Sequence, residues 1–425
     1  MREAAPAYRP RHPERTALYR TLERHYERYE RAYEERFEAR DGPWRPVVRA
    51  TVEAFLDCGR LHGGFARLRC PQCRGEHLLA FSCQTRNFCP SCQAKRAALF
   101  AERLSDSILA KAPHRHVVFT IPRVLRGLFG RDRRLLGLLA RCAYRTVRLG
   151  FQEWAGRYDA VPGMVASLQT FGASLAWHPH VHALVTEGLL AREGAYLPVA
   201  TIDSAALEAL FRRVVIAALV KARRLSAEFA RKLLAWRHSG FSVYAQQRIP
   251  KDEGARLAHL ARYLTRPPLA QARLRAAPDG ALLLQTPPDK QTGATALRLD
   301  PLELVHRLTL QIPDRGQHLV RYYGAYANRV RRLYRPGDGD EEAPRLRAPA
   351  ADPEEDSAYA RQRRKSWARL LRNLLEVEPL FCPACHVEMT IVSVLTDPYV
   401  VDAIVRHVEQ GRGRNPHEPR APPAA

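Results

Sequence analysis

The stretch AWHPHVHALV, residues 176–185, places three histidines at alternate positions of an otherwise apolar run. Alternate side chains of an extended strand point to one face of a sheet, so His178, His180 and His182 are expected to lie together. Three imidazoles on one face are poor core residues, whereas neutral imidazole is a common metal ligand. Because proline cannot donate to a strand ladder, Pro179 is expected to mark the strand's start, which makes His180 and His182 the firmer ligand pair.

Segments of alternating type surround this strand and predict an α+β fold. Strands are expected at 115–122, 163–171 and 241–249 and near 281–285 and 317–323, and helices near 133–155, 204–236 and 252–266. The tight turn FGAS, residues 171–174, predicts antiparallel pairing between the histidine strand and the strand before it. The expected architecture is therefore an antiparallel-sheet domain.

Composition divides the rest of the chain. Residues 14–40 are rich in Glu, Arg and Tyr and predict an exposed helix that Gly42 and Pro43 end. Residues 335–357 are rich in Pro, Gly and acid and indicate a linker. The expected parts are an N-terminal helix (1–45), a zinc-binding domain resembling a zinc ribbon (46–105), the sheet domain (106–335), the linker (336–362) and a small C-terminal region (363–425).

The charge balance points to a polyanionic partner. The chain has 68 Lys and Arg against 44 Asp and Glu, a formal net charge of +24. Phosphate neutralisation dominates nucleic-acid affinity, so nucleic acid is the favoured partner. No apolar run is long enough for a membrane span and no secretory signal occurs, so no membrane partner and a cytoplasmic location are expected.

Six of the nine cysteines lie between Cys58 and Cys92. Two CPxC motifs, Cys70 with Cys73 and Cys89 with Cys92, have the separation of the paired turns that bind one tetrahedral zinc ion. A disulfide is disfavoured by the cytoplasmic location, and redox CxxC motifs rarely come doubled. These four cysteines are the first predicted zinc ligands.

Other cysteines and histidines leave alternatives open. Cys58 and Cys83, with His62 and His77, either complete a second zinc site or are buried thiols and surface imidazoles. Cys382 and Cys385, followed by His386, repeat the CPxC motif, but no second pair is near in the sequence.

A candidate nucleophile lies later in the chain, in DEGARLAHLARYLTRPPLA, residues 252–270. Its leucine spacing predicts a short helix that Pro267 and Pro268 end. Tyr263 lies on that helix between Arg262 and Arg266. A tyrosine there is usually a packed aromatic, but flanking guanidinium groups favour ionisation of a phenol and bind phosphate.

Together these motifs, with LVRYYGAYANR (319–329) and FCPACHVEMTIV (381–392), resemble the rolling-circle insertion-sequence transposases of the ninety-one family. That family belongs to the HUH endonucleases, named for their His-hydrophobic-His motif. The resemblance covers about 45–335 and 363–408. It implies an HUH endonuclease fold for the sheet domain and a transposase zinc-binding domain before it.

The resemblance also implies roles for individual residues. His180, Val181 and His182 match the family's metal-binding motif, and Tyr263 matches its nucleophilic tyrosine. Gln169 is the first choice for a third metal ligand, ahead of His178 and His259, although an ordinary strand glutamine is the alternative. Well-known members have a second tyrosine where this chain has His259, so it resembles a one-tyrosine variant.

The implied reaction is metal-dependent cleavage and transfer of single-stranded DNA at transposon ends and target. Mg²⁺ or Mn²⁺ is the implied catalytic cofactor, zinc the structural one, and a 5′-phosphotyrosine the intermediate. Because no GxxxxGK[ST] phosphate loop is present, a host helicase is expected to unwind the DNA. The oligomeric state is left open, with a homodimer as one option.

Two alternatives belong to other classes. A metal-dependent hydrolase of small molecules also uses HxH pairs, but it predicts eight βα units and later His and Asp ligands, which the sequence lacks. A non-catalytic zinc-ribbon DNA-binding protein leaves the histidine strand and Tyr263 unexplained.

Overall fold

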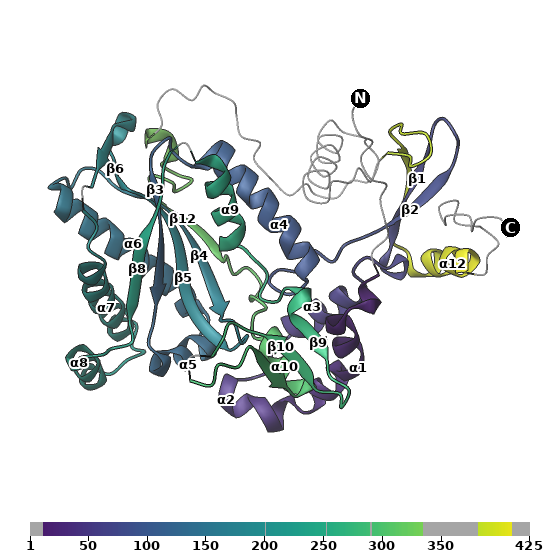
Figure 1. Ribbon diagram of the computed structural model, residues 1–425, viewed down its shortest axis with the longest axis horizontal. Helices are drawn as coiled ribbons and strands as arrows, with labels where there is room; N and C mark the ends of the chain where they lie inside the picture. The colour runs from purple at the N-terminus through teal and green to yellow at the C-terminus, as the bar shows by residue number, and fades with distance from the viewer. Residues whose placement is uncertain (1–11, 200, 252, 290, 335–380, 410–425) are drawn as a thin grey trace.

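The computed structural model describes residues 12–199, 201–251, 253–289, 291–334 and 381–409. Its central element is a five-stranded antiparallel sheet in the order β12-β4-β5-β3-β8 (Figure 1). The strands are β3 (His114–Thr120), β4 (Gly163–Phe171), β5 (Trp177–Thr186), β8 (Ser242–Ile249) and β12 (Val320–Gly324). The predicted α+β class and the antiparallel β4–β5 pairing are confirmed.

The histidine strand begins earlier than expected. β5 starts at Trp177, which pairs with Phe171, and the ladder between β4 and β5 is irregular between Gln169 and Phe171. Pairing of β5 with β3 begins only at His180. Pro179 therefore lies in a central strand at a place where the neighbouring ladders do not need its missing N–H.

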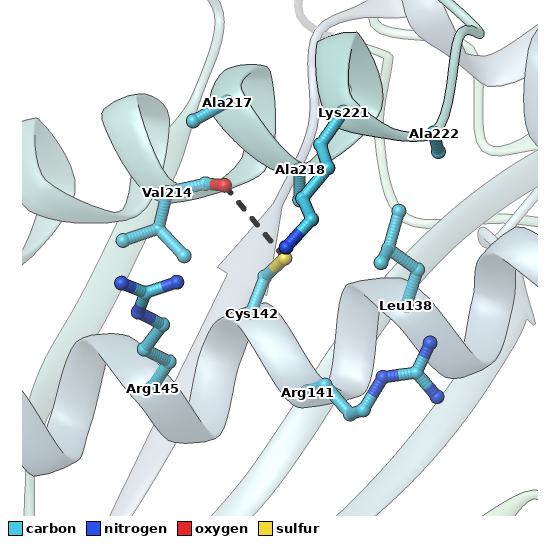
Figure 2. Close-up of a pocket in the computed structure, with 9 residues that line it drawn as sticks. All are labelled: Leu138, Arg141, Cys142, Arg145, Val214, Ala217, Ala218, Lys221 and Ala222. Atoms are coloured by element: carbon cyan, nitrogen blue, oxygen red, sulfur yellow. Dashed lines mark hydrogen bonds between the residues drawn. The ribbon is translucent and has the colours of Figure 1, made fainter.

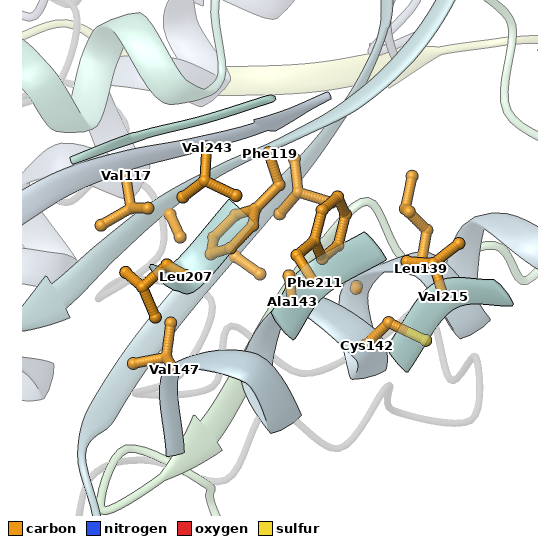
Figure 3. Close-up of a cluster of buried hydrophobic side chains, with 14 of the residues drawn as sticks. Val117, Phe119, Leu139, Cys142, Ala143, Val147, Leu207, Phe211, Val215 and Val243 are labelled. Carbon is orange, nitrogen blue, oxygen red and sulfur yellow. The ribbon is translucent and has the colours of Figure 1, made fainter. Parts of the chain in front are cut away.

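Four helices cover one face of the sheet and bury most of its apolar side chains. They are α5 (Arg123–Arg131), α6 (Arg134–Ala155), α7 (Ser204–Lys221) and α8 (Ala227–Ala235). Phe119 of β3 packs against Phe211 of α7, with ring centroids 5.0 Å apart, at the centre of this core (Figure 3). Alternate side chains of each strand point into this core, and the remaining side chains point to the other face of the sheet.

The second face is covered more sparsely, by α4 (Pro90–Arg103) and α9 (Gly254–Leu264), which pack against each other (Figure 1). Leu260 and Leu264 of α9 pack with Val165 of β4 and Leu184 of β5. The alternate histidines of β5 point to this side, because Val181 points into the opposite core.

The N-terminal segment is helical as predicted, but its aromatic face is buried. It comprises α1 (Ala17–Arg31), a π-helical segment (Glu34–Glu38) and α2 (Ala39–Asp41), and Gly42 follows with φ 92°. The expectation of an exposed helix was wrong, because Tyr29 and Phe37 pack on His306 of α10 (Pro301–Thr309). Glu and Arg cover only the outer face of α1, and the aromatics form the inner one.

This N-terminal core includes elements that the sequence pattern did not predict. They are α3 (Val47–Leu56) and two strands, β9 (Leu274–Ala276) and β11 (Ala296–Leu299), which pair on either side of the strand predicted near 281–285, β10 (Leu282–Gln285), in a small antiparallel sheet. A two-stranded sheet of β6 (Gly188–Leu190) and β7 (Tyr196–Pro198) extends the other end of the domain.

A further sheet joins distant parts of the chain. The hairpin of β1 (Phe65–Arg69) and β2 (Glu76–Ala80) pairs with β13 (Thr390–Leu395), and α12 (Pro398–Glu409) packs beside it (Figure 1). The expected linker and the first part of the expected C-terminal region, through residue 380, lie outside the described residues. Within the described ranges no helix is long and apolar enough to cross a membrane.

Candidate active site

The two histidines of the HxH motif converge on a single point. The Nε2 atoms of His180 and His182 lie 3.1 Å apart, and both side chains are buried. Two nitrogens that bind one cation, each at about 2.1 Å, are at most about 4.2 Å apart, so this separation fits two ligands of the same ion.

Hydrogen bonds determine which nitrogen of each ring carries the proton. Nδ1 of His180 donates to the backbone carbonyl of His178 (2.7 Å), which leaves Nε2 with a free lone pair. Nδ1 of His116 donates to Oε1 of Gln247 (3.1 Å), which leaves Nε2 of His116 as an acceptor. That Nε2 accepts a hydrogen bond from Nδ1 of His182 (3.0 Å). The Nε2 lone pairs of His180 and His182 therefore face each other, an arrangement that a cation between them would stabilise.

Burial keeps both imidazoles neutral. It lowers the pKa of His180 to about 4 and that of His182 to about 2, and Arg266 acts in the same direction on both. Neutral imidazole is the form that binds metal, so both rings are ready to bind a cation at neutral pH.

Gln169 lies directly opposite His180 in the β4–β5 ladder and therefore on the same face of the sheet. Its Nε2 donates to the carbonyls of Tyr263 (3.3 Å) and Leu264 (3.1 Å) at the end of α9. Its Oε1 is buried and has no hydrogen-bond partner in the described structure. A buried amide oxygen without a partner is costly, and a cation would satisfy it.

The other proposed ligands are less well placed. His178 is half-buried and its ring lies 4.9 Å from that of His180, with Nε2 buried and without a partner in the described part of the chain. His259 lies on the exposed side of α9. His178 thus remains a candidate for an additional ligand, whereas the exposure of His259 does not favour it.

Tyr263 lies against these histidines. Its ring is edge-on to that of His182, with centroids 5.4 Å apart, and 6.2 Å from that of His116. The guanidinium carbon of Arg266 lies 4.4 Å from the centre of the Tyr263 ring. Arg262, the other flanking arginine, has an exposed side chain. The structure therefore brings the Tyr263 phenol and the Arg266 guanidinium of one segment together with the HxH pair of another segment that is distant in sequence.

Side chains of the sheet and of α4 hold the end of α9 in place. Ser167 Oγ donates to the carbonyl of Leu264 (2.6 Å), beside the Gln169 contacts. Gln93 of α4 donates from Nε2 to the carbonyl of Thr265 (2.7 Å) and accepts from the Asn87 amide (3.0 Å). These bonds satisfy the carbonyl groups that a helix leaves free at its C-terminus, and they position Tyr263.

The rival tyrosines of the RYYGAYANR segment are placed differently. Tyr326 is buried and its hydroxyl lies 2.6 Å from Nε2 of His114. Tyr323 points to the opposite face of the sheet, where it stacks on Tyr144. Tyr322 shares the histidine face, and burial raises its pKa. None of these rings has a described ring contact with His180 or His182.

The structure groups the cysteines differently from the prediction. One cluster joins Cys89 and Cys92 with Cys58 and Cys83 instead of with the other CPxC motif. The sulfur separations are 3.8 Å between Cys58 and Cys89 and 3.6 Å between Cys92 and each of Cys58 and Cys83. Four sulfurs at these separations fit a tetrahedral zinc ion.

The other CPxC motif forms a second cluster. Cys70 and Cys73 lie with Cys382 and Cys385, and the four sulfur atoms lie within 4.8 Å of one another. The expected single site of two CPxC motifs was therefore wrong, because each motif pairs with cysteines from elsewhere. His62, His77 and His386 belong to neither cluster.

A pocket on the opposite side of the molecule has no part in this constellation. It lies between α6 and α7, and Arg141, Arg145 and Lys221 surround the buried thiol of Cys142 (Figure 2). Cys142 Sγ lies 3.9 Å from the carbonyl oxygen of Val214. No carboxylate lines the pocket, so its charge suits a phosphate group.

Comparisons with known proteins match two parts of this chain. The family model described as "Transposase zinc-binding domain" matches residues 22–121, and the one described as "Putative transposase" matches 163–333. The "Transposase for insertion sequence element IS801" of Pseudomonas savastanoi pv. phaseolicola is 28% identical over 82% of this chain and 84% of that protein. No solved structure matches the chain.

A second relative, "Putative transposase y4qJ" of Sinorhizobium fredii (strain NBRC 101917 / NGR234), is 28% identical over 75% of this chain and 81% of its own length. The second family model includes Gln169, His180, His182 and Tyr263, and the first includes the cluster of Cys58, Cys83, Cys89 and Cys92. The chain belongs to the IS91 family of insertion-sequence transposases and carries that family's zinc-binding domain.

Proposed function

We propose that this transposase cleaves and rejoins single-stranded DNA as a one-tyrosine HUH endonuclease. The observation that supports this most is the edge-on packing of Tyr263 on His182, whose Nε2 faces that of His180. A phenol beside two free imidazole lone pairs is an arrangement for attack on a phosphate that a bound cation orients.

His180, His182 and Gln169 are the proposed ligands of Mg²⁺ or Mn²⁺. The two facing lone pairs and the buried Gln169 oxygen without a partner fit such an ion. When bound, a divalent cation would polarise the scissile phosphate and neutralise its charge. His116 and the His178 carbonyl hold the two imidazoles in the tautomers that this role requires.

Tyr263 is the proposed nucleophile. Its hydroxyl oxygen forms a bond to phosphorus, the bond from phosphorus to the 3′ oxygen breaks, and the phenol proton ends on the released 3′-OH. The product is a 5′-phosphotyrosine, which keeps the energy of the broken phosphodiester bond, so rejoining to another 3′-OH requires no nucleotide. Arg266, whose guanidinium lies over the Tyr263 ring, is the proposed contact to the scissile phosphate.

The partners follow from this reaction. Single strands at the element's ends and at the target are the proposed substrates in rolling-circle transposition, and a host helicase would supply them. Arg141, Arg145 and Lys221 offer phosphate contacts away from the cleavage site. We also propose that the chain acts in the cytoplasm, at the nucleoid when bound to DNA.

The rival functions predict other features. A barrel hydrolase needs parallel βα units, whereas the sheet that carries the histidines is antiparallel throughout. A non-catalytic zinc-ribbon protein would bind DNA without becoming bonded to it. Covalent attachment therefore separates the proposed enzyme from the second rival.

The test uses single strands of the DNA that flanks the coding sequence, incubated with the full chain and Mn²⁺. A 5′-phosphotyrosine retains the 3′ part of the strand, so a 3′-labelled strand should run with the protein in denaturing gels, whereas a 5′-labelled strand should give a shorter free fragment. Attachment of the 5′ label, or cleavage without attachment of either label, would contradict the mechanism.

A further inference from the structure

The second cysteine cluster is built from two segments that are far apart in the sequence. Cys70 and Cys73 lie in the turn of the β1–β2 hairpin, and Cys382 and Cys385 precede β13. Cys73 and Cys382 are 309 positions apart in sequence, yet their sulfurs are 3.7 Å apart. The family's zinc-binding model ends at residue 121 and so contains only half of this cluster.

The sulfur positions have the dimensions of a zinc site. Four sulfurs bonded to a tetrahedral zinc ion at about 2.3 Å are about 3.8 Å from one another. The Cys73–Cys382 separation of 3.7 Å agrees with this value, and all four sulfurs lie within 4.8 Å of one another.

The two halves also share one backbone conformation. The residue after each motif, Arg74 or His386, has a left-handed backbone with φ 57° or 55°. Its amide donates to the carbonyl of the motif's first cysteine, at 3.0 Å for Arg74 and 2.8 Å for His386.

A second backbone bond closes each turn. Cys70 donates to the Gly75 carbonyl and Cys382 to the Val387 carbonyl, both at 2.9 Å. The motif at Cys89 differs, because its proline begins helix α4. The 70–75 turn therefore matches the 382–387 turn and not the nearer CPxC motif, which indicates that the 70–75 and 382–387 turns form one site.

In the described part of the chain, the β1–β13 ladder and two small apolar clusters also hold this region together. The apolar contacts around the cluster are those of Leu68 and Met389 with a few half-buried neighbours. Phe65 packs separately with Val401 and Val405 of α12. Apolar clusters of this size stabilise a small sheet weakly, and small domains usually need a metal or disulfide in addition.

We propose that Cys70, Cys73, Cys382 and Cys385 bind one structural zinc ion that fastens residues 381–409 to the β1–β2 hairpin. The hairpin, β13 and α12 then form a single zinc-dependent module, in place of the separate C-terminal region that the sequence suggested. This site is independent of the strand-cleavage proposal, because none of its residues lies in the histidine and tyrosine constellation.

Zinc content and hydrogen exchange of the purified full chain test this site. The wild-type chain should contain two zinc ions, one for each cysteine cluster. The double variant Cys382→Ser/Cys385→Ser should contain one, and amides of 381–409 should exchange faster, whereas β4 and β5 keep their protection. Cys70→Ser/Cys73→Ser should also speed hydrogen exchange in residues 381–409, although the substitutions lie far away in sequence. Cys142→Ser, at a buried cysteine outside both clusters, should change neither the zinc content nor the exchange rates.

Some outcomes would overturn the proposal. One is a wild-type chain with a single zinc ion, a result that does not depend on the folding of any variant. The others are two zinc ions retained in Cys382→Ser/Cys385→Ser, or unchanged protection of 381–409 in both double variants.

Discussion

The ring of Tyr263 stands edge-on to the ring of His182, with centroids 5.4 Å apart and planes at 88°. The tyrosine comes from helix α9 and the histidine from the centre of the sheet, so their contact depends on how α9 is held. Ser167 and Gln169 bind its last carbonyls from β4, and Gln93 binds Thr265 from α4.

Replacing His116 tests how the ligand tautomers are set. His116→Leu removes the acceptor for Nδ1 of His182, so that His182 is free to rotate or change tautomer. The affinity for Mn²⁺, measured by calorimetry, should fall about 10-fold to 100-fold, the usual effect of removing such a partner. His238→Ala, at an exposed histidine outside the site, should leave the affinity unchanged. Wild-type affinity in His116→Leu would show that the hydrogen bond does not orient His182.

Gln93 connects the first cysteine cluster to the tyrosine helix, because it directly follows Cys92. The Gln93→Leu variant should retain the zinc ion of the first cysteine cluster. Its rate of strand cleavage should fall by about 10-fold or more, because a small displacement of the Tyr263 hydroxyl has an effect of this size. Gln271→Leu, at an exposed position, serves as the control. Zinc analysis and single-turnover cleavage measure the two quantities. A cleavage rate equal to wild type would mean that β4 alone holds α9.

The buried histidines predict a loss of stability in acid for the protein free of divalent cation. Burial lowers the pKa of His178 and His180 from 6.5 to about 4 in the folded state. Above pH 6.5 these histidines are neutral in both the folded and the unfolded chain, so they do not change the stability there. As the pH falls from 6.5 to 4 the unfolded chain binds protons first, so the free energy of unfolding decreases.

Urea unfolding of the wild type and of His178→Gln, between pH 7.5 and 4.5, measures this effect. The variant should lose less stability over this range, because one histidine with a lowered pKa no longer contributes. Parallel pH profiles for the two proteins would contradict the prediction.

The net charge predicts strong salt dependence of binding to single-stranded DNA. Each lysine or arginine that contacts a phosphate releases a counterion, so the logarithm of the affinity should fall steeply with the logarithm of salt concentration. Replacing Arg141, Arg145 and Lys221 by alanine should reduce the slope by about one for each phosphate that these side chains neutralise. A slope near zero in the wild type would contradict electrostatic binding. An unchanged slope in the variant would exclude the α6–α7 pocket as a phosphate-binding site.

Parts of the fold were predictable because local patterns determine them. The alternation in β5 indicated that His180 and His182 share a face, and the FGAS turn indicated the neighbour of that strand. His116 was missed because its contact with His182 depends on the register of β3 against β5, which no local pattern encodes. The role of the aromatic face of α1 was missed for a similar reason, since its partner α10 lies far along the chain.

The cysteine grouping shows the same limit. Spacing suggested that Cys70 and Cys73 bind with Cys89 and Cys92, which are the nearest pair in sequence. The second pair begins a helix, whereas the first lies in a hairpin turn whose counterpart is at 382–387. Sequence distance says little about which turns meet, because antiparallel pairing of β1 with β13 brings the chain back from its far end.

Mass-spectrometric identification of the residue bonded to DNA tests the cleavage proposal most directly. After incubation with Mn²⁺ and single strands of the flanking DNA, nuclease and protease digestion should leave a nucleotide on the peptide that contains Tyr263. Tyr263→Phe, which keeps the ring, should form no adduct and still bind DNA, and Tyr322→Phe should form the adduct as the wild type does. A nucleotide on any other tyrosine, or an adduct that persists in Tyr263→Phe, would contradict the assignment of Tyr263 as the nucleophile.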